Sequence, residues 1–411
     1  MSGAALDALA SARQLRPGSL EEAAEEMRRA AAENARMLFV GGGTELSLGA
    51  PPAGVDRVLA TERLDRVVEH APLDQIVSVE AGVRLASLQE LLARSGQMLA
   101  LDPPWAGRAT LGGLVATNAF GPRRTRYGGI RDLIIGIGIV RADGTQARGG
   151  GKVVKNVAGF DLPKLMVGSL GTLGLIATVI FRLHPLPETQ ATVLFADLDA
   201  EDVRTLVLAL RQAQLEPTAV AALVHEGGAD LGVRFDGRFE LGVRFEGFEA
   251  GVRQQTAKLT ELATRRGWEA RALDSAGARA FWERHDGSRE SAAGFRAKLA
   301  APPMELERVS NAALGSLFPV LQNPRAVVYP TLGLSFVGGD VPAVAPVASA
   351  VVAAREALRP GSVVLHAAPP ELRAAVDVWG PPPPSLPLMA RMKERLDPDR
   401  RLAPGRFVGG I

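Results

Sequence analysis

Four clusters of glycine within residues 101–184 are the positions whose type and spacing could do chemistry. A further glycine run, Gly41–Gly43, lies upstream of them. Glycine allows a backbone to approach a ligand closely and to adopt positive φ angles. Such clusters predict a site that holds a large, flat, phosphate-bearing molecule mostly through main-chain groups. The clusters are Gly112–Gly113, Gly128–Gly129, Gly149–Gly151, and Gly168 with Gly171 and Gly174.

Two common nucleotide-binding motifs are excluded by particular residues. A dinucleotide fingerprint needs a third glycine three residues after its G-x-G, yet Gly136–Gly138 is followed by Ile139–Arg141. A P-loop needs a hydroxyl directly after its lysine, and Val153 follows Lys152. With both motifs excluded, FAD held mainly by backbone groups is the candidate cofactor.

The composition is that of an ordinary globular protein. The chain has 411 residues, of which 47% are apolar and 22% charged, and its net charge is +2. This length predicts two or three domains with enough material for a buried core. The basic residues form no stripe with interleaved aromatics, so we expect no nucleic acid partner.

Cysteine is absent and histidine is scarce. Without cysteine the chain can form no disulfide and offers no thiolate to an iron–sulfur cluster. None of the five histidines lies at metal-ligand spacing from another, so no metal site is expected. No apolar run approaches the roughly 20 residues that span a bilayer, and no secretory signal is present. We expect a cytoplasmic protein that meets a membrane, if at all, peripherally through a partner.

The elements that position the first glycine run follow from local signals. Ser19 can cap a helix over residues 20–34, whose first turns carry several glutamates. Met37–Val40 is an apolar strand that ends at Gly41–Thr44. Consecutive N–H groups on a tight turn after a strand make a concave nest, and such a nest binds phosphate.

The later glycines also stand at the borders of predicted elements. Leu111–Thr117 carries small residues that can pass flat against a ring system, and Leu133–Val140 is an apolar strand. Lys164–Leu170 is predicted to be helical. Gly171–Gly174 follows it and leads into an apolar strand that ends at Phe181.

From about residue 190 the pattern changes to strands and amphipathic helices. Leu231–Gly237 and Leu241–Gly247 are near-repeats, and Asp236-Gly237 between them predicts a hairpin. This ordering indicates a separate α+β domain with an antiparallel sheet. The adjacent aromatics Phe281 and Trp282 are expected in its core.

The sequence also predicts the domain boundaries and the place of the two ends of the chain. Residues 1–16 are expected to be a flexible terminus. Residues 17–187 form the first domain and residues 188–380 the second. Residues 381–411 begin with a polyproline spacer and are expected to return to the first domain.

Six segments in order carry a family resemblance: GGGTEL, LDPP, ATLGGLVATN, GPRRTRYGGIRD, GGGKVVKNVAGFDLPKL and GSLGTLG. Together they resemble the FAD-binding domain of the vanillyl-alcohol oxidase/p-cresol methylhydroxylase superfamily. Within it the chain is most similar to the FAD-binding (E) subunits of glycolate oxidase. The resemblance implies an α+β fold: a two-part FAD-binding domain of the p-cresol methylhydroxylase type, with an antiparallel-sheet cap domain.

The resemblance also implies which positions bind FAD. Some superfamily members attach the flavin through a histidine directly after the glycine run. Thr44 occupies that place here, so we expect non-covalent FAD. The implied cofactor-binding residues are Gly41, Gly42, Gly43, Thr44, Pro104, Thr110, Gly112, Gly113, Asn118, Gly121, Tyr127, Gly128, Gly171, Thr172, Gly174 and Ile176.

The chain departs from its relatives where catalysis would be expected. Related 2-hydroxy-acid dehydrogenases, including the D subunit of glycolate oxidase, carry clustered histidines near the end of the cap. Here His366 stands alone, so the catalytic residues stay unassigned. The resemblance implies a complex that oxidises glycolate to glyoxylate. In it a D-type flavoprotein subunit oxidises the small 2-hydroxy acid, and an iron–sulfur subunit takes the electrons onward.

Two alternatives stay open. The chain could be a self-sufficient FAD-dependent dehydrogenase or oxidase of another 2-hydroxy acid, in which Lys152, Lys155 and Asn156 polarise the substrate or the flavin. These three residues could equally satisfy loop backbone. The chain could instead be a structural subunit that has lost its flavin, although the intact glycine loops argue against this.

Overall fold

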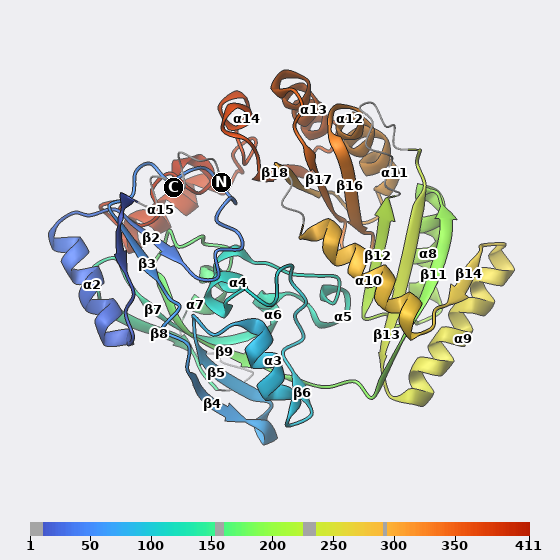
Figure 1. Ribbon diagram of the computed structural model, residues 1–411, viewed down its shortest axis with the longest axis horizontal. Helices are drawn as coiled ribbons and strands as arrows, with labels where there is room; N and C mark the ends of the chain where they lie inside the picture. Colours follow the sequence, from blue (N-terminus) through green and yellow to red (C-terminus); the bar gives the residue numbers. More distant parts are fainter. Residues whose placement is uncertain (1–10, 153–159, 225–235, 291–293) are drawn as a thin grey trace. The chain divides into compact units, whose positions relative to one another are not determined.

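The computed structural model describes residues 11–152, 160–224, 236–290 and 294–411. The chain divides into two compact units, which are described separately (Figure 1). Unit 1 comprises Met1–Gly121, Tyr127–Leu186 and Pro381–Ile411, and unit 2 comprises Pro122–Arg126 and Pro187–Gly380.

Unit 1 contains two main sheets. The smaller is parallel, with the strand order β1-β3-β2, and the larger is antiparallel, with the order β4-β5-β9-β7-β8. A two-stranded pair, β6 with β10, completes the unit. The strands are β1 (Arg13–Leu15), β2 (Met37–Val40), β3 (Arg57–Ala60), β4 (Val67–Ala71), β5 (Ile76–Glu80), β6 (Gln97–Met98), β7 (Ile134–Val140), β8 (Gln146–Gly150), β9 (Leu175–Arg182) and β10 (His184–Pro185).

The expected flexible terminus is wrong for residues 13–15. Strand β1 pairs in parallel with β3, and its Leu15 is buried in the core beneath the small sheet. One buried side chain on a three-residue strand leaves almost no periodic signal in the sequence, because alternation needs several residues to be visible.

Helix α2 (Leu20–Ala32) forms where the sequence predicted it. Its N-cap Ser19 accepts a hydrogen bond from the Glu22 N–H at 3.1 Å, which satisfies one of the free donors of the first turn. The buried face, which includes Ala23, Met27 and Ala30, packs on the small sheet and on the ends of β7 and β9. These contacts hold β2 in place, and β2 leads into the first glycine run.

The larger sheet packs on a second core with the remaining helices of unit 1. Apolar side chains from β5, β7 and β9 meet Leu88 and Leu92 of α3 and Leu114 of α4. The helices are α3 (Leu85–Ala93), α4 (Leu111–Thr117), α6 (Ile130–Leu133) and α7 (Leu162–Met166), with the short η1 (Pro72–Asp74); the short α5 (Arg124–Tyr127) has its first three residues in unit 2. Helix α7 lies earlier than the expected Lys164–Leu170, because Asp161 caps it through the Lys164 N–H.

The C-terminal segment belongs to unit 1. Helix α15 (Leu386–Leu396) is followed by an extended run that pairs Leu402 with Met37 of β2. The buried Lys393 donates to Asp397 at 2.6 Å, and Asp397 accepts the N–H groups of Arg401 and Leu402. This closed network fixes the last turn of the segment. The chain then ends in η4 (Val408–Gly410).

Unit 2 is built on one eight-stranded sheet in which every neighbouring pair is antiparallel. The strand order is β14-β11-β13-β12-β16-β17-β15-β18. With the mixed architecture of unit 1, this sheet confirms the α+β class. The strands are β11 (Thr189–Leu198), β12 (Ala219–Val224), β13 (Phe239–Gly247), β14 (Ala270–Ala272), β15 (Phe295–Ala300), β16 (Gln322–Tyr329), β17 (Leu334–Asp340) and β18 (Ser362–Ala367).

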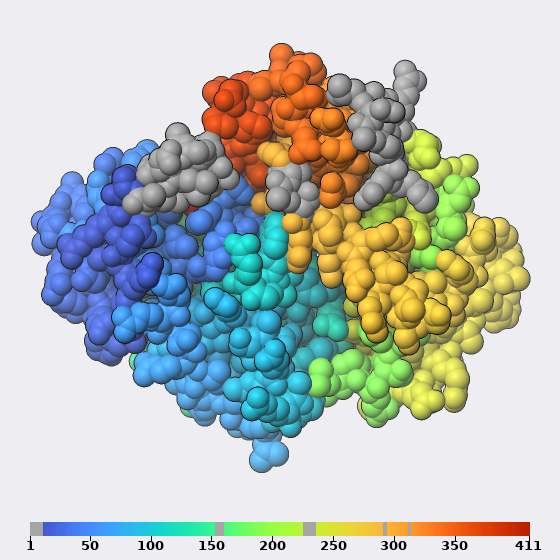
Figure 2. Space-filling model, viewed as in Figure 1, coloured from blue at the N-terminus to red at the C-terminus, as the bar shows by residue number. Residues whose placement is uncertain are grey.

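Helices cover the sheet of unit 2. Helix α9 contacts β11 and β13, and α10 contacts β16 and β17. The outer faces of α9 and α10 form the yellow and light-orange surface in the space-filling view (Figure 2). Phe281 and Trp282 of α10 are buried, as expected. The helices are α8 (Ala200–Gln212), α9 (Glu249–Arg266), α10 (Ser275–Arg289), α11 (Leu306–Arg308), η2 (Val309–Leu314), α12 (Gly315–Leu317), η3 (Phe318–Val320), α13 (Val344–Ala357) and α14 (Pro370–Ala375).

The two near-repeats of the sequence belong to unit 2. The first strand of the predicted hairpin, Leu231–Gly237, falls mostly on residues 231–235, which lie outside the described residues. The second near-repeat is β13, and its neighbours are β11 and β12.

The short segment Pro122–Arg126 groups with unit 2, although the sequence placed it inside the first domain. Arg123 pairs with the buried Glu246 at 2.7 Å, and the Thr125 hydroxyl lies 2.9 Å from that of Thr331. These contacts form at long range in the chain, so no local pattern announces them.

Candidate cofactor site

Unit 1 contains a half-open pocket of about 700 Å³, a volume that includes its mouth. Three segments form most of its walls: the turn after β2, helix α4, and the turn before β9. The lining residues are Phe39, Val40, Gly41, Gly42, Gly43, Thr44, Glu45, Leu46, Thr61, Ala81, Thr110, Gly112, Gly113, Ala116, Thr117, Leu170, Gly171, Gly174, Leu175, Ile176 and Arg406.

The turn after β2 presents backbone donors to the pocket. Gly43 adopts φ of +70°, a conformation that other residues rarely take, so the chain can turn sharply there. Within the described residues, no acceptor is assigned to the N–H groups of Gly43 and Thr44. Adjacent N–H groups on such a turn form an anion-binding nest, so this wall suits a phosphate.

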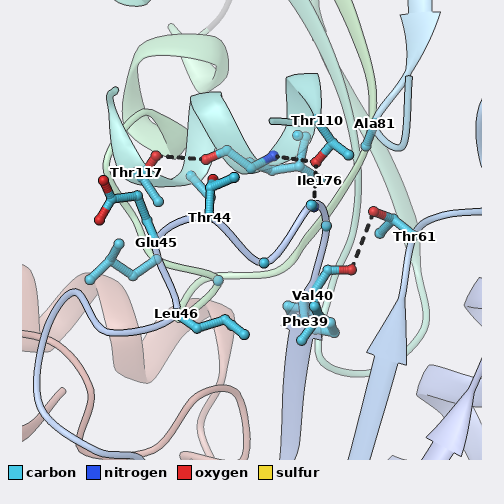
Figure 3. A pocket seen from close by; sticks show the side chains of 18 of the residues that line it. Phe39, Val40, Thr44, Glu45, Leu46, Thr61, Ala81, Thr110, Thr117 and Ile176 are labelled. Carbon is cyan, nitrogen blue, oxygen red and sulfur yellow. Dashed lines mark hydrogen bonds between the residues drawn. The ribbon is translucent and has the colours of Figure 1, made fainter. Parts of the chain in front are cut away.

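Thr110 joins the turn to helix α4. Its hydroxyl oxygen accepts long hydrogen bonds from the Gly42 N–H (3.3 Å) and the Gly113 N–H (3.4 Å), as Figure 3 shows. The second bond caps α4 at its start. Thr110 therefore fixes two walls of the pocket relative to each other.

Three of the predicted glycines are required by neighbouring protein atoms. A β-carbon on Gly41 would lie 2.1 Å from Thr110 Oγ1, and one on Gly42 would lie 1.9 Å from the Arg108 carbonyl oxygen. On Gly112 it would lie 2.6 Å from the β-carbon of Ala81. Glycine at these positions lets the walls pack together, which shapes the pocket.

Gly113 has a different environment. A β-carbon there would meet Thr110 Oγ1 at 3.1 Å and nothing else within 4 Å. Gly113, Ala116 and Thr117 are half-buried and line the pocket. The Thr117 hydroxyl donates a hydrogen bond to the Gly113 carbonyl oxygen at 2.8 Å (Figure 3). Its hydrogen is therefore used within the helix and is not offered to the pocket. This face of α4 can receive a flat ring.

The opposite wall comes from the turn before β9. Gly171, Gly174 and Ile176 line the pocket with Leu170. Phe39 of β2 packs on Gly171, where a β-carbon would lie 3.0 Å from the phenyl ring. The pocket therefore has polar donors at one end and apolar walls elsewhere, the usual character of a ligand site.

Six of the predicted cofactor-binding residues do not line the pocket. Tyr127 stacks edge-on against His184 at 4.9 Å, and Gly121 packs on the Asp102 carbonyl. Thr172 is buried, and its hydroxyl bonds to the Ser169 carbonyl. The six are Pro104, Asn118, Gly121, Tyr127, Gly128 and Thr172; the other predicted residues are brought together.

Several lining residues were missed by the sequence reasoning. Ala116 and Thr117 belong to Leu111–Thr117, the segment that was predicted to pass flat against a ring system. Arg406 lies in the C-terminal segment that was predicted to return to the first domain, but its own contact with a turn more than 350 residues away was not predicted. The missed residues are Phe39, Val40, Glu45, Leu46, Thr61, Ala81, Leu170 and Arg406.

Unit 2 holds a buried polar cluster around Tyr329. The Tyr329 hydroxyl contacts His285 Nε2 at 2.8 Å and accepts a hydrogen bond from Arg289. Tyr329 is fully buried and His285 is 2% exposed. Burial lowers the pKa of His285, against the opposing charge of Asp286. These side chains satisfy one another's hydrogen bonds and are shielded from solvent.

His366, on β18, packs edge-on against Phe336 at 6.3 Å. Burial lowers its pKa well below the usual value, and the positive charges of Lys298 and Arg296 add to this effect. It is therefore neutral near pH 7. In the part of the chain that the structure describes, no group of three His, Cys, Asp or Glu side chains could hold a metal ion.

Of the three residues proposed to act on the substrate, the structure describes Lys152 alone. Lys152 pairs with Glu69 and is exposed. Lys155 and Asn156 lie outside the described residues.

Among the described helices, none is both long and apolar enough to cross a membrane.

Part of the first domain is similar to a known family. The FAD binding domain family matches residues 12–150. Glycolate oxidase subunit GlcE of Escherichia coli (strain K12) is 31% identical over 52% of this chain and 59% of its own length. D-2-hydroxyglutarate dehydrogenase of Xanthomonas citri pv. viticola is 35% identical over 48% of this chain and 42% of its own. The chain thus spans about half the length of these curated relatives.

The fold extends beyond the matched domain. The solved structure of p-cresol methylhydroxylase with substrate bound superposes with a TM-score of 0.74. The alignment covers 96% of this chain and 88% of that one, at 16% sequence identity, so it speaks for the fold alone. Residues 12–150 thus match the FAD binding domain family, in a chain whose fold is similar to that of p-cresol methylhydroxylase.

Proposed function

We propose that FAD binds non-covalently in the pocket of unit 1. The donor set fits this cofactor: the N–H groups of Gly43 and Thr44 suit its phosphates, and the side-chain-free face at Gly113 suits a flat ring. Thr44 stands directly after the glycine run, and its hydroxyl is no counterpart of the histidine that links flavin in some relatives.

We further propose that the chain takes part in oxidising a small 2-hydroxy acid, with glycolate as the first candidate. The observation that carries this proposal is the pocket, combined with relatives named glycolate oxidase subunit and D-2-hydroxyglutarate dehydrogenase. Bound FAD would supply a two-electron acceptor for a CH–OH donor. The chain's own contribution is to hold that acceptor and to exclude water from its apolar walls.

The proton acceptor for this reaction is better sought on a partner. Tyr329 and His285, which could take a hydroxyl proton, are closed off in the core of unit 2. We therefore favour a complex with a D-type flavoprotein subunit and an iron–sulfur subunit over a self-sufficient enzyme. The absence of cysteine from the sequence fits iron–sulfur clusters carried by a partner.

Anaerobic titration with glycolate tests the proposal, on the isolated chain beside the reconstituted complex. We expect both to be yellow, with flavin released by acid. We expect substrate to bleach flavin absorbance in the complex. D-lactate and D-2-hydroxyglutarate serve as competing substrates, and the complex lacking this chain is the control.

Each outcome is informative. Bleaching of the isolated chain at the same rate as the complex would replace the subunit role with the self-sufficient enzyme. Flavin that stays with acid-precipitated protein would refute non-covalent binding. A reconstituted complex that no 2-hydroxy acid bleaches would remove the proposed activity while leaving FAD binding intact.

A further inference from the structure

Arg406 places a positive charge at the pocket. The residue is 5% exposed, and Glu45 is the other ionised residue of the lining. Its Nη2 donates to the carbonyl oxygens of Glu45 (3.1 Å) and Leu46 (3.0 Å). Arginine keeps its charge throughout the physiological pH range and carries five donors. A buried cation thus stands beside the turn that presents the Gly43 and Thr44 N–H groups.

The backbone around Arg406 holds the rest of the same loop. The Ala50 N–H donates to the Arg406 carbonyl at 3.0 Å, and the Ala53 N–H donates to the Pro404 carbonyl at 2.7 Å. The Arg406 side chain and the backbone of Pro404 and Arg406 therefore all form hydrogen bonds with the loop after β2. The shape of the phosphate-binding turn depends on a segment at the other end of the chain.

The same C-terminal segment also holds the opposite wall. Lys393 is 1% exposed, and its Nζ donates to the Thr172 carbonyl at 2.8 Å. Thr172 lies within the turn whose glycines, Gly171 and Gly174, line the pocket. Segment 393–406 therefore ties together two walls that come from different sheets.

We propose that the C-terminal segment is part of the FAD site and that Arg406 both positions the turn after β2 and attracts the phosphates of the ligand. This inference rests on FAD binding in the pocket, and it is independent of which substrate is oxidised. Opposite charges attract strongly where solvent is excluded. A guanidinium also suits phosphate better than an ammonium does.

The test compares three ligands on the full-length chain freed of flavin: FAD, ADP and riboflavin, each titrated by calorimetry at low and high salt. We expect Arg406→Gln to weaken FAD and ADP roughly 10- to 100-fold, as expected for one charge-assisted hydrogen bond. Riboflavin, which lacks phosphate, should change less than about threefold. Arg395→Ala, an exposed arginine of the same helix–tail segment, is the matched control and should change nothing.

The variant Arg406→Lys separates charge from shape. It keeps the charge but carries it on a compact ammonium instead of a planar guanidinium, so we expect an intermediate loss for FAD with the salt dependence retained. If Arg406→Gln does not fold, the wild-type protein still decides: high salt should weaken ADP and leave riboflavin unchanged. An equal loss for all three ligands in Arg406→Gln, or wild-type ADP binding that ignores salt, would overturn the charge role.

Discussion

Replacement of Gly113 by alanine gives the sharpest test of where the flavin lies. In the free protein the added methyl meets one neighbour, Thr110 Oγ1, at 3.1 Å, a contact that a shift of a few tenths of an ångström relieves. Alanine in a helix is favoured over glycine by about 1 kcal/mol. The flavin-free protein should therefore keep its melting temperature or gain slightly.

FAD binding should respond in the opposite direction. The methyl would project from α4 into the space where a flat ring would lie. Overfilling a packed contact costs about 1–3 kcal/mol, which corresponds to a roughly 10- to 100-fold weaker Kd. Quenching of flavin fluorescence on binding measures this for FAD and for riboflavin, and both should weaken because the ring itself is obstructed.

The matched control is Gly107→Ala. Gly107 is exposed, lies outside the pocket, and would gain a β-carbon that meets nothing within 4 Å. It should leave FAD affinity unchanged. If Gly113→Ala binds FAD as tightly as the wild type and this control do, the ring does not lie against α4, and the orientation of the ligand must be reversed or abandoned.

Three further predictions address the frame of the site. Gly112→Ala should lower the free energy of unfolding by about 1–3 kcal/mol in denaturant titrations, since its β-carbon would lie 2.6 Å from that of Ala81; an unchanged midpoint would mean that α4 can shift freely. Lys393→Met should cost about 3–5 kcal/mol because Asp397 stays buried without its ammonium partner. Adding Asp397→Asn, which removes the charge and keeps an acceptor for the Arg401 and Leu402 N–H groups, should recover part of the loss, whereas no recovery would assign the effect to the contacts of Lys393 with the Thr172 and Leu402 carbonyls. His366 should stay neutral from about pH 8 to pH 6 in NMR titrations assigned with His366→Asn. Because its folded-state pKa lies below its unfolded value, stability should fall as the pH drops below about 6.5, and ring protonation near the ordinary pKa would contradict this.

Local signals predicted the elements around the first glycine run well. Ser19 caps α2, Met37–Val40 forms β2 with the expected bounds, and the turn follows directly. These elements are decided by residues within a few positions of one another. Strand β15, with its alternating Phe295–Ala300, carried the same kind of signal and was overlooked.

Other features had no local cause. Strand β1 is held by one buried side chain, and Pro122–Arg126 is held by partners such as Glu246 and Thr331. Arg406 reaches the pocket because the C-terminal segment pairs with β2. Contacts at such separation depend on the complete fold, and one sequence offers no pattern that links their two ends.

The glycines show where a correct motif still leaves the chemistry undecided. The absence of a side chain leaves space beside the backbone, but the sequence does not show whether protein atoms or a ligand fill that space. At Gly42 the space is filled by the Arg108 carbonyl, and at Gly149 it is filled by Leu162; neither Gly149 nor Leu162 is among the lining residues of the pocket. At Gly113 the room opens into the pocket. The residues that shape the site and the residue that would touch the ring are therefore chemically identical in sequence, and only their neighbours in space assign them different roles.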